Sequence, residues 1–249
     1  MPIPKDFTPD SNLLDGRVVL VTGATSGLGR ALALECARAG ATVVLCGRNP
    51  AKLDRLYDEI ESLKAPQPAI AVLDLATATA VDYDALAKTI GSEFGKLDGL
   101  VHAAGLLGDR TPLDQYDVPT WCKVLHVNLT APFILTQVLL PDLRKSPDAS
   151  VIFVSSGVVR NPRPFWGAYA VAKAGLESVR SMLAQELEGE RNIRVNSINP
   201  GRMRTPMRAA AYPAEDPNTL PTPASVTGPF LYLLSARGQG IDGEYLDAQ

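Results

Sequence analysis

Residues 17–29 have the sequence RVVLVTGATSGLG, and the prediction of the fold starts from this stretch. The apolar, β-branched run 17–22 predicts a strand. It leads into glycines spaced as Gly23-x-x-x-Gly27-x-Gly29, and a helical pattern follows at 27–39. Glycine allows a sharp turn and close approach of backbone N–H groups to a phosphate, and a helix N-terminus favours negative charge. The stretch therefore predicts a strand, turn and helix that bind a dinucleotide pyrophosphate; a simple tight turn is the alternative.

The same alternation of short apolar runs and helical patterns continues along the chain. Further strands are expected at 41–46, 69–73, 97–102, 150–155, 193–198 and 243–248, and further helices at 50–63, 82–94, 120–143, 167–188 and 223–235. Several strands are continuously apolar, as in strands that are covered on both faces. The pattern predicts an α/β protein: a single-domain, Rossmann-type, doubly wound parallel sheet of about seven strands with helices on both faces.

The chain shows no internal repeat and no linker that would divide it. Residues 1–14 contain three prolines and no apolar segment, so they are expected to form a mobile or surface-draped arm before a single domain at 15–249. One long irregular stretch, 202–223, is rich in proline and contains the run AAA at 209–211. Long loops in compact domains are usually functional or disordered, and we expect this one to be a substrate lid with a short helix.

Composition excludes several classes of partner. The 249 residues are 46% apolar in short, scattered runs, and the formal net charge is −3. No run approaches the roughly 20 residues needed to cross a bilayer, and nucleic-acid surfaces are usually basic. Three distant cysteines and two histidines without zinc-site spacing predict no metal, and free thiols in a reducing compartment. We expect a cytoplasmic protein with neither membrane nor nucleic acid as partner.

Cofactor choice is determined at the end of the second strand. An acidic residue about 20 positions after the glycine turn would bind the ribose 2′-hydroxyl of NAD. Here Gly47 occupies that place and Arg48 follows it, so a guanidinium is available to pair with a 2′-phosphate. This predicts NADP(H) in preference to NAD(H), with a solvated surface arginine as the alternative. Asp74 is placed to contact the adenine, and Ala104-Gly105 would let the backbone pass close to the ribose.

A second motif, GAYAVAK at 167–173, places Tyr169 and Lys173 four residues apart on a predicted helix, with Ser156 13 residues before the tyrosine. Residues at this spacing share one face of a helix. A phenol with its usual pKa of about 10 is a poor acid at neutral pH, but a nearby ammonium favours the phenolate. Tyr169 could then exchange a proton with a carbonyl oxygen that Ser156 holds.

These motifs together resemble the short-chain dehydrogenase/reductase family over about residues 14–248. The resemblance rests on TGATSGLG, LDL at 73–75, HAAG at 102–105, HVN ending at Asn128, SS at 155–156, YAVAK and NPGRMRT at 199–205. It implies a seven-stranded sheet, a homodimer or homotetramer, and a catalytic set of Asn128, Ser156, Tyr169 and Lys173. Asn128 would hold a water that relays protons to Lys173. The implied cofactor-binding residues are Gly23, Thr25, Ser26, Gly27, Leu28, Gly29, Arg48, Asp74, Leu75, Ala104, Gly105, Tyr169, Lys173, Pro200, Gly201 and Thr205.

Within the family, AGLLGD at 104–109, WGAYA at 166–170 and the terminal LDAQ resemble the YciK group of bacterial oxidoreductases. One position departs from the family pattern, in which two asparagines usually precede the Ala-Gly pair. Here these positions are His102 and Ala103. Ala103 cannot make the amide hydrogen bond that ties neighbouring strands, so we expect reduced local stability, and we expect His102 to pack or to meet a backbone group.

The combined motifs predict an NADP(H)-dependent carbonyl reductase or alcohol dehydrogenase with Tyr169 as general acid and base. A catalytically silent dinucleotide-binding regulator is the alternative. A sugar-nucleotide epimerase would need a larger C-terminal domain. Two questions stay open in the sequence. The arginines at 160, 163, 202, 204 and 208 could bind an anionic substrate or be surface charge. Phe165 and Trp166 could form a substrate wall or a subunit contact.

Overall fold

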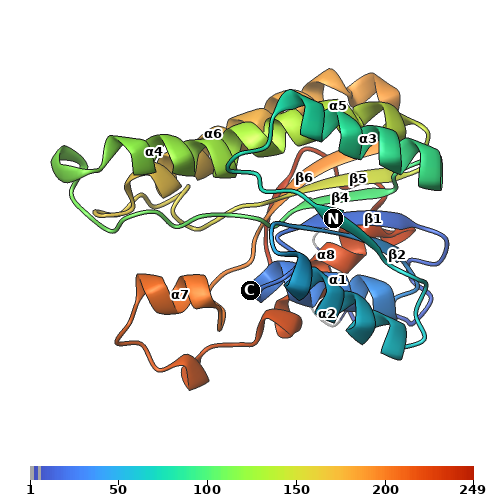
Figure 1. The fold of residues 1–249 in the computed structure, drawn as a ribbon, viewed down its shortest axis with the longest axis horizontal. Helices are drawn as coiled ribbons and strands as arrows, with labels where there is room; N and C mark the ends of the chain where they lie inside the picture. The colour runs from blue at the N-terminus through green and yellow to red at the C-terminus, as the bar shows by residue number, and fades with distance from the viewer. Residues whose placement is uncertain (1–2, 5–6) are drawn as a thin grey trace.

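All seven strands of the computed structural model run parallel in one sheet (Figure 1). The structure describes residues 3–4 and 7–249. The strand order is β3-β2-β1-β4-β5-β6-β7. The strands are β1 (Val18–Thr22), β2 (Thr42–Gly47), β3 (Ala69–Val72), β4 (Gly99–His102), β5 (Ala149–Val154), β6 (Ile193–Asn199) and β7 (Tyr245–Asp247). The predicted doubly wound sheet of about seven strands is confirmed, with β7 at an edge.

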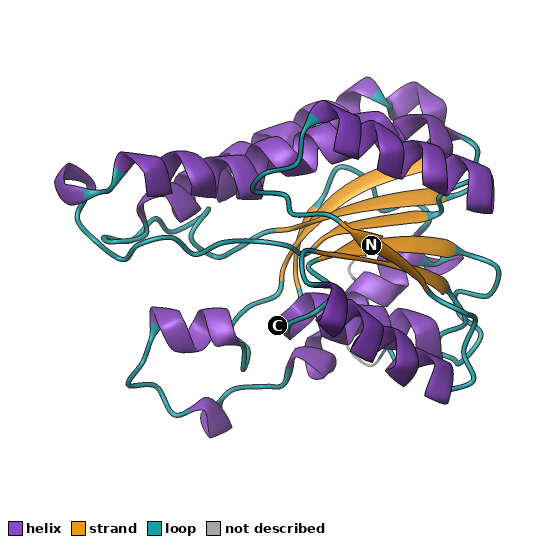
Figure 2. Cartoon of the chain, viewed as in Figure 1, coloured by secondary structure: helices purple, strands orange, loops and turns teal. Residues whose placement is uncertain are grey.

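Helices cover both faces of the sheet, so the molecule has three layers (Figure 2). One layer contains α3 (Ala80–Phe94), α4 (Val118–Leu125), α5 (Ala131–Arg144) and α6 (Gly167–Glu186). The other contains α1 (Gly27–Arg38), α2 (Pro50–Ser62) and α8 (Gly228–Leu234). The remaining helix, α7 (Pro206–Ala211), stands apart from the layers, beyond the carboxyl ends of the strands.

The central strands β1 and β2 are largely apolar because alternate side chains enter different cores. Val19 and Val21 of β1 pack with the α1, α2 and α8 layer. Val18 and Leu20 of the same strand pack with the α3, α5 and α6 layer. Successive side chains of a strand point to opposite faces, so a strand covered on both sides has no polar face. This explains why continuous apolar runs located the central strands correctly.

Local sequence determines where several helices begin. Asn49 accepts a hydrogen bond from the backbone N–H of Lys52 at 3.0 Å, and Pro50 occupies the first turn of α2, as the sequence predicts. Thr79 and Asp82 form a capping box, which starts α3 two residues before the expected position. The helix expected at 223–235 is instead a short 3-10 turn, Pro223–Val226, followed by α8.

One long helical segment, Val118–Arg144, joins α4 to α5 through a π-helical turn, His126–Thr130. The segment has 27 residues and contains an 18-residue window with a mean hydropathy of 1.4, so by length and composition alone it could cross a membrane. This corrects the expectation that no stretch approaches that length. Part of its apolar surface belongs to the core, because Leu135, Leu139 and Leu143 are fully buried against the sheet, whereas Phe133 is 47% exposed.

The predicted arm at 1–14 includes residues 1–2 and 5–6, which lie outside the described part of the chain. Of its described residues, Ile3, Phe7 and Leu13 pack against the core under α1, α2 and α8. The Phe7 ring meets Tyr232 edge-on with 5.0 Å between centroids, and Leu14 is fully buried. The segment 202–223, called the lid segment below, contains α7, in agreement with the predicted short helix. It lies at the same end of the sheet as the loops that follow β4 and β5 (Figure 1).

Candidate active site

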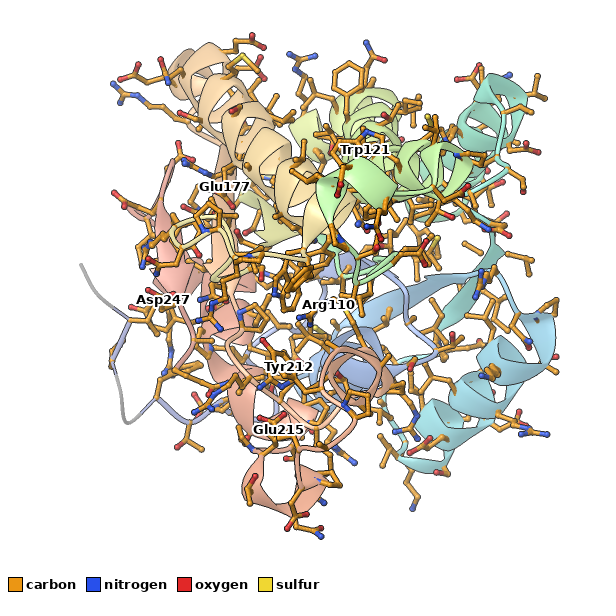
Figure 3. All side chains as sticks on the ribbon, turned by 90° about the vertical axis from the view of Figure 1, so that its left-hand side faces the viewer. Arg110, Trp121, Glu177, Tyr212, Glu215 and Asp247 are labelled. Atoms are coloured by element: carbon orange, nitrogen blue, oxygen red, sulfur yellow. The ribbon has the colours of Figure 1, made fainter. Side chains whose placement is uncertain are left out.

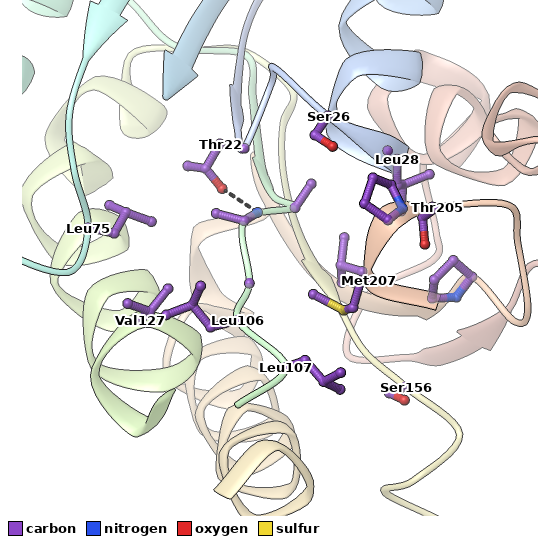
Figure 4. A pocket seen from close by; sticks show the side chains of 18 of the residues that line it. Thr22, Ser26, Leu28, Leu75, Leu106, Leu107, Val127, Ser156, Thr205 and Met207 are labelled. Atoms are coloured by element: carbon purple, nitrogen blue, oxygen red, sulfur yellow. Dashed lines mark hydrogen bonds between the residues drawn. The ribbon is translucent and has the colours of Figure 1, made fainter. Parts of the chain in front are cut away.

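A cavity of about 570 Å³ opens at the carboxyl ends of the central strands. Open parallel sheets bind ligands just outside the carboxyl ends of the strands, at the point where the strand order reverses. Here that point lies between the neighbouring strands β1 and β4. The cavity is lined by most of the predicted site residues: Gly23, Thr25, Ser26, Gly27, Leu28, Arg48, Asp74, Leu75, Ala104, Gly105, Ser156, Tyr169, Lys173, Pro200, Gly201 and Thr205. Two predicted residues, Gly29 and Asn128, lie behind the wall. One space therefore joins the glycine turn to the tyrosine and lysine of α6. Figure 4 shows Ser26 and Leu28 of the glycine turn on one side of this space and Ser156 on another.

The glycine turn requires glycine for reasons of space. Gly23 has φ +67°, and a Cβ atom there would lie 2.8 Å from the Cα of Ala104. A Cβ atom on Gly29 would lie 2.3 Å from the carbonyl oxygen of Gly23, so this glycine lets α1 approach β1 closely. Gly27, with φ +51°, faces Thr205 of the lid segment. The absence of side chains leaves the N-terminus of α1 open to the cavity, which fits a pyrophosphate.

Lys173 lies one helical turn after Tyr169 on α6, and both side chains are buried. The Lys173 Nζ atom donates a hydrogen bond to the carbonyl oxygen of Val154 at 2.6 Å and lies 5.8 Å from the centre of the Tyr169 ring. Burial lowers the pKa of the Lys173 ammonium to about 8, and the carboxylate of Glu177 acts in the opposite direction. Ser156 follows the end of β5 and lines the same cavity.

The pKa of Tyr169 corrects one step of the sequence argument. The Lys173 ammonium was expected to lower it. In the structure burial of the phenol is the largest influence and raises the pKa, while the neighbouring Ser156 hydroxyl acts to lower it. The physical reason is that the phenolate loses hydration in a buried, largely apolar environment. The three side chains still meet at one place, as the sequence predicts.

Asn128 lies in the π-helical turn and is fully buried. Its side-chain oxygen accepts a hydrogen bond from the Leu106 backbone N–H at 2.8 Å, and its amide nitrogen donates to the Leu106 carbonyl at 2.7 Å. A π turn commonly marks a functional position in a helix. Asn128 therefore fixes the backbone of the loop after β4, where that loop forms the cavity wall.

Thr22 at the end of β1 makes two hydrogen bonds to the backbone around Ala103. Its hydroxyl accepts a hydrogen bond from the Ala104 N–H at 3.1 Å and donates to the Val101 carbonyl at 3.4 Å (Figure 4). Both bonds connect the end of β1 to the end of β4. These bonds tie the two strands beside Ala103, and reduced local stability at Ala103 stays a prediction.

His102 packs within the core rather than facing the cavity. Its ring stacks on Phe153 with 4.9 Å between centroids, and Nε2 lies 2.8 Å from the Thr136 hydroxyl. That hydroxyl already donates to the Pro132 carbonyl, so it accepts a hydrogen bond from the N–H group at Nε2. Nδ1 is buried without a hydrogen-bond partner among the described residues. Burial, with a smaller effect of the Lys173 charge, lowers the pKa of His102 to about 3.

This buried histidine should make the protein less stable in acid. Its pKa falls from 6.5 to about 3 on folding, so between these values the unfolded chain binds a proton that the folded chain does not. We expect His102 alone to remove up to about 1.4 kcal/mol of unfolding free energy for each pH unit below about 6.5. Urea unfolding of wild type and His102→Asn across this range measures the difference. Parallel pH curves would contradict the assignment.

Cationic side chains lie at the end of the cavity formed by β2 and β3. Arg48 is exposed beside Gly47, and Lys52 of α2, which sequence reasoning missed, lines the same part. Lys52 could be found from its position in the first turn after the Asn49 cap. Asp74 also lines this end, and its side chain accepts a hydrogen bond from the Ala76 N–H at 3.0 Å. Two cations and no opposing carboxylate at the end of β2 fit a phosphorylated ribose.

A cluster of arginine and aromatic side chains at the other end was also missed. The Arg110 guanidinium lies 4.5 Å from the Trp166 ring and 5.3 Å from the Tyr212 ring, and it donates to the Ala211 carbonyl at 2.9 Å. Figure 3 shows Arg110 next to Tyr212, with Glu215 beyond. We call Arg110, Trp166 and Tyr212 the clasp, because they connect the lid segment to the loops after β4 and β5. No local sequence signal links these three positions.

The C-terminal residues hold the loop at Pro200 in place. The Gln249 side chain donates to the Pro200 carbonyl at 2.6 Å and to the Arg202 carbonyl at 2.9 Å. Asp247 of β7 accepts hydrogen bonds from Asn199 and Arg160. The final strand therefore holds one wall of the cavity. In the described part of the chain, no group of three or more His, Cys, Asp or Glu side chains could hold a metal ion.

With this geometry in view, the relationships of the chain are clear. The sequence matches the short chain dehydrogenase family over residues 17–216. It is 44% identical over 243 residues to the oxidoreductase YciK of Escherichia coli strain K12, a match that covers 98% of this chain and 96% of that protein. The chain belongs to the short-chain dehydrogenase/reductase family and is an oxidoreductase of that family, similar to YciK.

Solved structures with bound cofactor share the fold. A short chain dehydrogenase from Shigella flexneri 2a strain 301, complexed with NADP, has a TM-score of 0.94 and 43% identity, covering 96% of this chain and 100% of that one. A second from Escherichia coli CFT073, complexed with NADPH, has a TM-score of 0.94 and 45% identity, covering 97% and 100%. The resemblance drawn from the sequence motifs is confirmed.

Proposed function

We propose that the protein transfers a hydride between NADP(H) and a carbonyl or alcohol substrate, with Tyr169 as general acid and base. The observation that carries this proposal is the meeting of the buried Tyr169 and Lys173 with Ser156 in the cavity that begins at the glycine turn. When bound, the nicotinamide supplies or accepts the hydride. The open N-terminus of α1 and the cations Arg48 and Lys52 would hold the phosphates.

Side chains of the protein position the substrate oxygen and exchange a proton with it. Ser156 positions the oxygen by a hydrogen bond, and the Tyr169 hydroxyl donates its proton to that oxygen during reduction or accepts one during oxidation. Burial opposes ionisation of the phenol, so Lys173 and a positively charged ligand ring are needed to favour the phenolate. Asn128 fixes the wall at Leu106, and its role in relaying protons to Lys173 through a water remains part of the proposal.

Turnover in the presence of carbonyl compounds tests this function. The purified protein is supplied with NADPH and a broad set of aldehydes and ketones, and NADPH absorbance is followed. We expect substrate-dependent consumption of NADPH. Tight binding of NADPH with no consumption across the set would instead favour a catalytically silent dinucleotide-binding protein.

The cofactor preference depends on Arg48. We expect Arg48→Ala to weaken NADPH binding by roughly 10- to 100-fold, because a charge-assisted hydrogen bond to the 2′-phosphate is lost, and to leave NADH binding nearly unchanged. Calorimetric titration of both cofactors measures this. Arg55→Ala removes the same charge from an exposed position of α2 and is the matched control. Tighter binding of NADH than NADPH by the wild-type protein would reject the preference.

Assembly and location complete the proposal. Phe133 of α5 and Val171 and Met182 of α6 are 47%, 48% and 55% exposed, and apolar exposure of this kind supports a homodimer or homotetramer. The unpaired cysteines Cys36, Cys46 and Cys122 support a reducing compartment, such as the cytoplasm.

A further inference from the structure

The part of the cavity next to Tyr169 is bounded by apolar side chains from three separate segments. Leu106 and Leu107 come from the loop after β4, Trp166 from the start of α6, and Met207 from α7 of the lid segment. All four are partly buried and pack in one cluster with Tyr169. Figure 4 shows Leu107 and Met207 near Ser156, around the same space. We call these four side chains the apolar wall.

Trp166 and Met207 close this space from two sides. The Trp166 ring lies 5.6 Å from the Tyr169 ring, tilted by 52°. Met207 reaches across the cavity, since a Cβ atom on Gly105 of the opposite wall would lie 3.7 Å from its terminal methyl carbon. Methionine adapts its shape to a ligand, and tryptophan offers a large apolar face. A substituent beside the reacting carbon would contact these two residues.

Most arginines near this end already have partners. Arg208 lines the cavity, but it pairs with both carboxylate oxygens of Glu215, at 2.5 and 2.6 Å, and stacks on Tyr212 at 3.8 Å. Arg110 is engaged in the clasp, and Arg160 pairs with Asp247 at 2.6 Å. Arg163 and Arg204 do not line the cavity. Arg202 is the exception: it lines the cavity and is exposed.

From this arrangement we propose that the substrate is an uncharged carbonyl compound whose substituent is apolar and is held between Leu107, Trp166 and Met207. The inference rests on the proposed function. In the reducing direction the nicotinamide hydride adds to the carbonyl carbon and the Tyr169 proton to the oxygen, so an aldehyde or ketone becomes an alcohol and NADPH becomes NADP⁺. An anionic substituent would lose its hydration against this wall, whose four apolar side chains offer it no charged partner.

The same reasoning resolves the two questions that the sequence left open. Trp166 lines the cavity, whereas its neighbour Phe165 does not and is 50% exposed. The arginines around the lid segment serve mainly to hold the protein together. The clasp then acts as a support for the apolar wall, because Arg110 packs against Trp166 and bonds to the end of α7, which carries Met207.

A matched set of aldehydes tests the proposal. Benzaldehyde and cyclohexanecarbaldehyde are compared with para-carboxybenzaldehyde, which adds a carboxylate to the same ring, and kcat/KM is measured with NADPH. We expect the neutral probes to exceed the carboxylated probe by about tenfold or more. Trp166→Ala and Met207→Ala should each lower kcat/KM for the neutral probes by roughly 10- to 100-fold. Phe165→Ala, which removes a similar aromatic area next to the site, should change it less than about threefold.

Two results would overturn the inference while leaving hydride transfer intact. One is a preference for the carboxylated probe that disappears in Arg202→Ala, since Arg202 would then be recognising an anion. The other is an equal loss of kcat/KM for the neutral probes in Trp166→Ala and Phe165→Ala, which would show that Trp166 has no particular role in holding the substrate.

Binding separates this inference from the proposed function. In a Trp121→Phe background Trp166 is the one remaining tryptophan, so its fluorescence reports contact. Benzyl alcohol added to the protein saturated with NADP⁺ should change this fluorescence, and para-carboxybenzyl alcohol should not. A fluorescence change for the neutral probe without turnover of any aldehyde supports the apolar wall and sinks the proposed function. If benzyl alcohol does not change the fluorescence, the proposal that Trp166 contacts the apolar substituent is contradicted.

Discussion

Replacement of the proposed proton donor, Tyr169→Phe, should lower kcat by about a thousandfold and leave NADPH affinity within about twofold of wild type. The ring stays in its cluster beside Trp166, so packing is preserved, and only the hydroxyl that we propose exchanges a proton is lost. Steady-state turnover and calorimetric titration of NADPH measure the two effects separately. The structural basis is that the hydroxyl lies in the same cavity as Ser156 and Lys173.

Tyr116→Phe is the matched control for this experiment. Tyr116 belongs to the same cluster, but its hydroxyl accepts a hydrogen bond from the Asp109 N–H and does not line the cavity. Its removal should cost less than about threefold in kcat. Substantial turnover by Tyr169→Phe, or an equal loss in the control, would show that another group moves the proton.

A single methyl group at Gly29 should destabilise the fold and the cofactor site together. The Cβ atom of Gly29→Ala would lie 2.3 Å from the Gly23 carbonyl oxygen and 3.1 Å from that of Thr22. Both atoms are backbone, so α1 must move away from β1. We expect unfolding free energy to fall by about 2–3 kcal/mol, as for overpacking of a rigid core, and NADPH affinity to fall by about tenfold or more because the helix N-terminus shifts.

Gly189→Ala provides the comparison. No atom lies within 4 Å of the Cβ position at Gly189, which lies in a short 3-10 turn, Glu188–Glu190. The substitution should change the unfolding free energy by less than about 0.5 kcal/mol. Urea unfolding and NADPH titration of both variants provide the test. Equal stability of the two variants would mean that the contact of α1 with β1 is looser than the structure has it.

The strands and the central site were predictable because their signals are local. Continuous apolar runs located β1, β2 and β5, and a four-residue spacing placed Tyr169 and Lys173 on one face of α6. The glycine turn was also predictable, because backbone atoms pass so close to Gly23 and Gly29 that a side chain does not fit at either position. Helix ends were predicted less accurately where a capping box determines the first residue of the helix, as at Thr79 before α3.

Features built from distant segments were not predictable from the sequence. The clasp joins positions 110, 166 and 212, and the hydroxyl of Thr22 ties the end of β1 to the backbone next to Ala103. The direction of the Tyr169 pKa shift was wrong because the degree of burial depends on the surrounding loops, which no periodicity describes. Ion pairs such as that between Arg208 and Glu215 likewise decide whether a cation near the cavity is available to a ligand.

The clasp also has a consequence for anyone who redesigns this enzyme. Because Arg110 touches two aromatic rings and a main-chain carbonyl at once, changes at its three members are coupled energetically and their effects will not add. Selectivity is therefore better altered by libraries that randomise all three positions together than by successive single replacements.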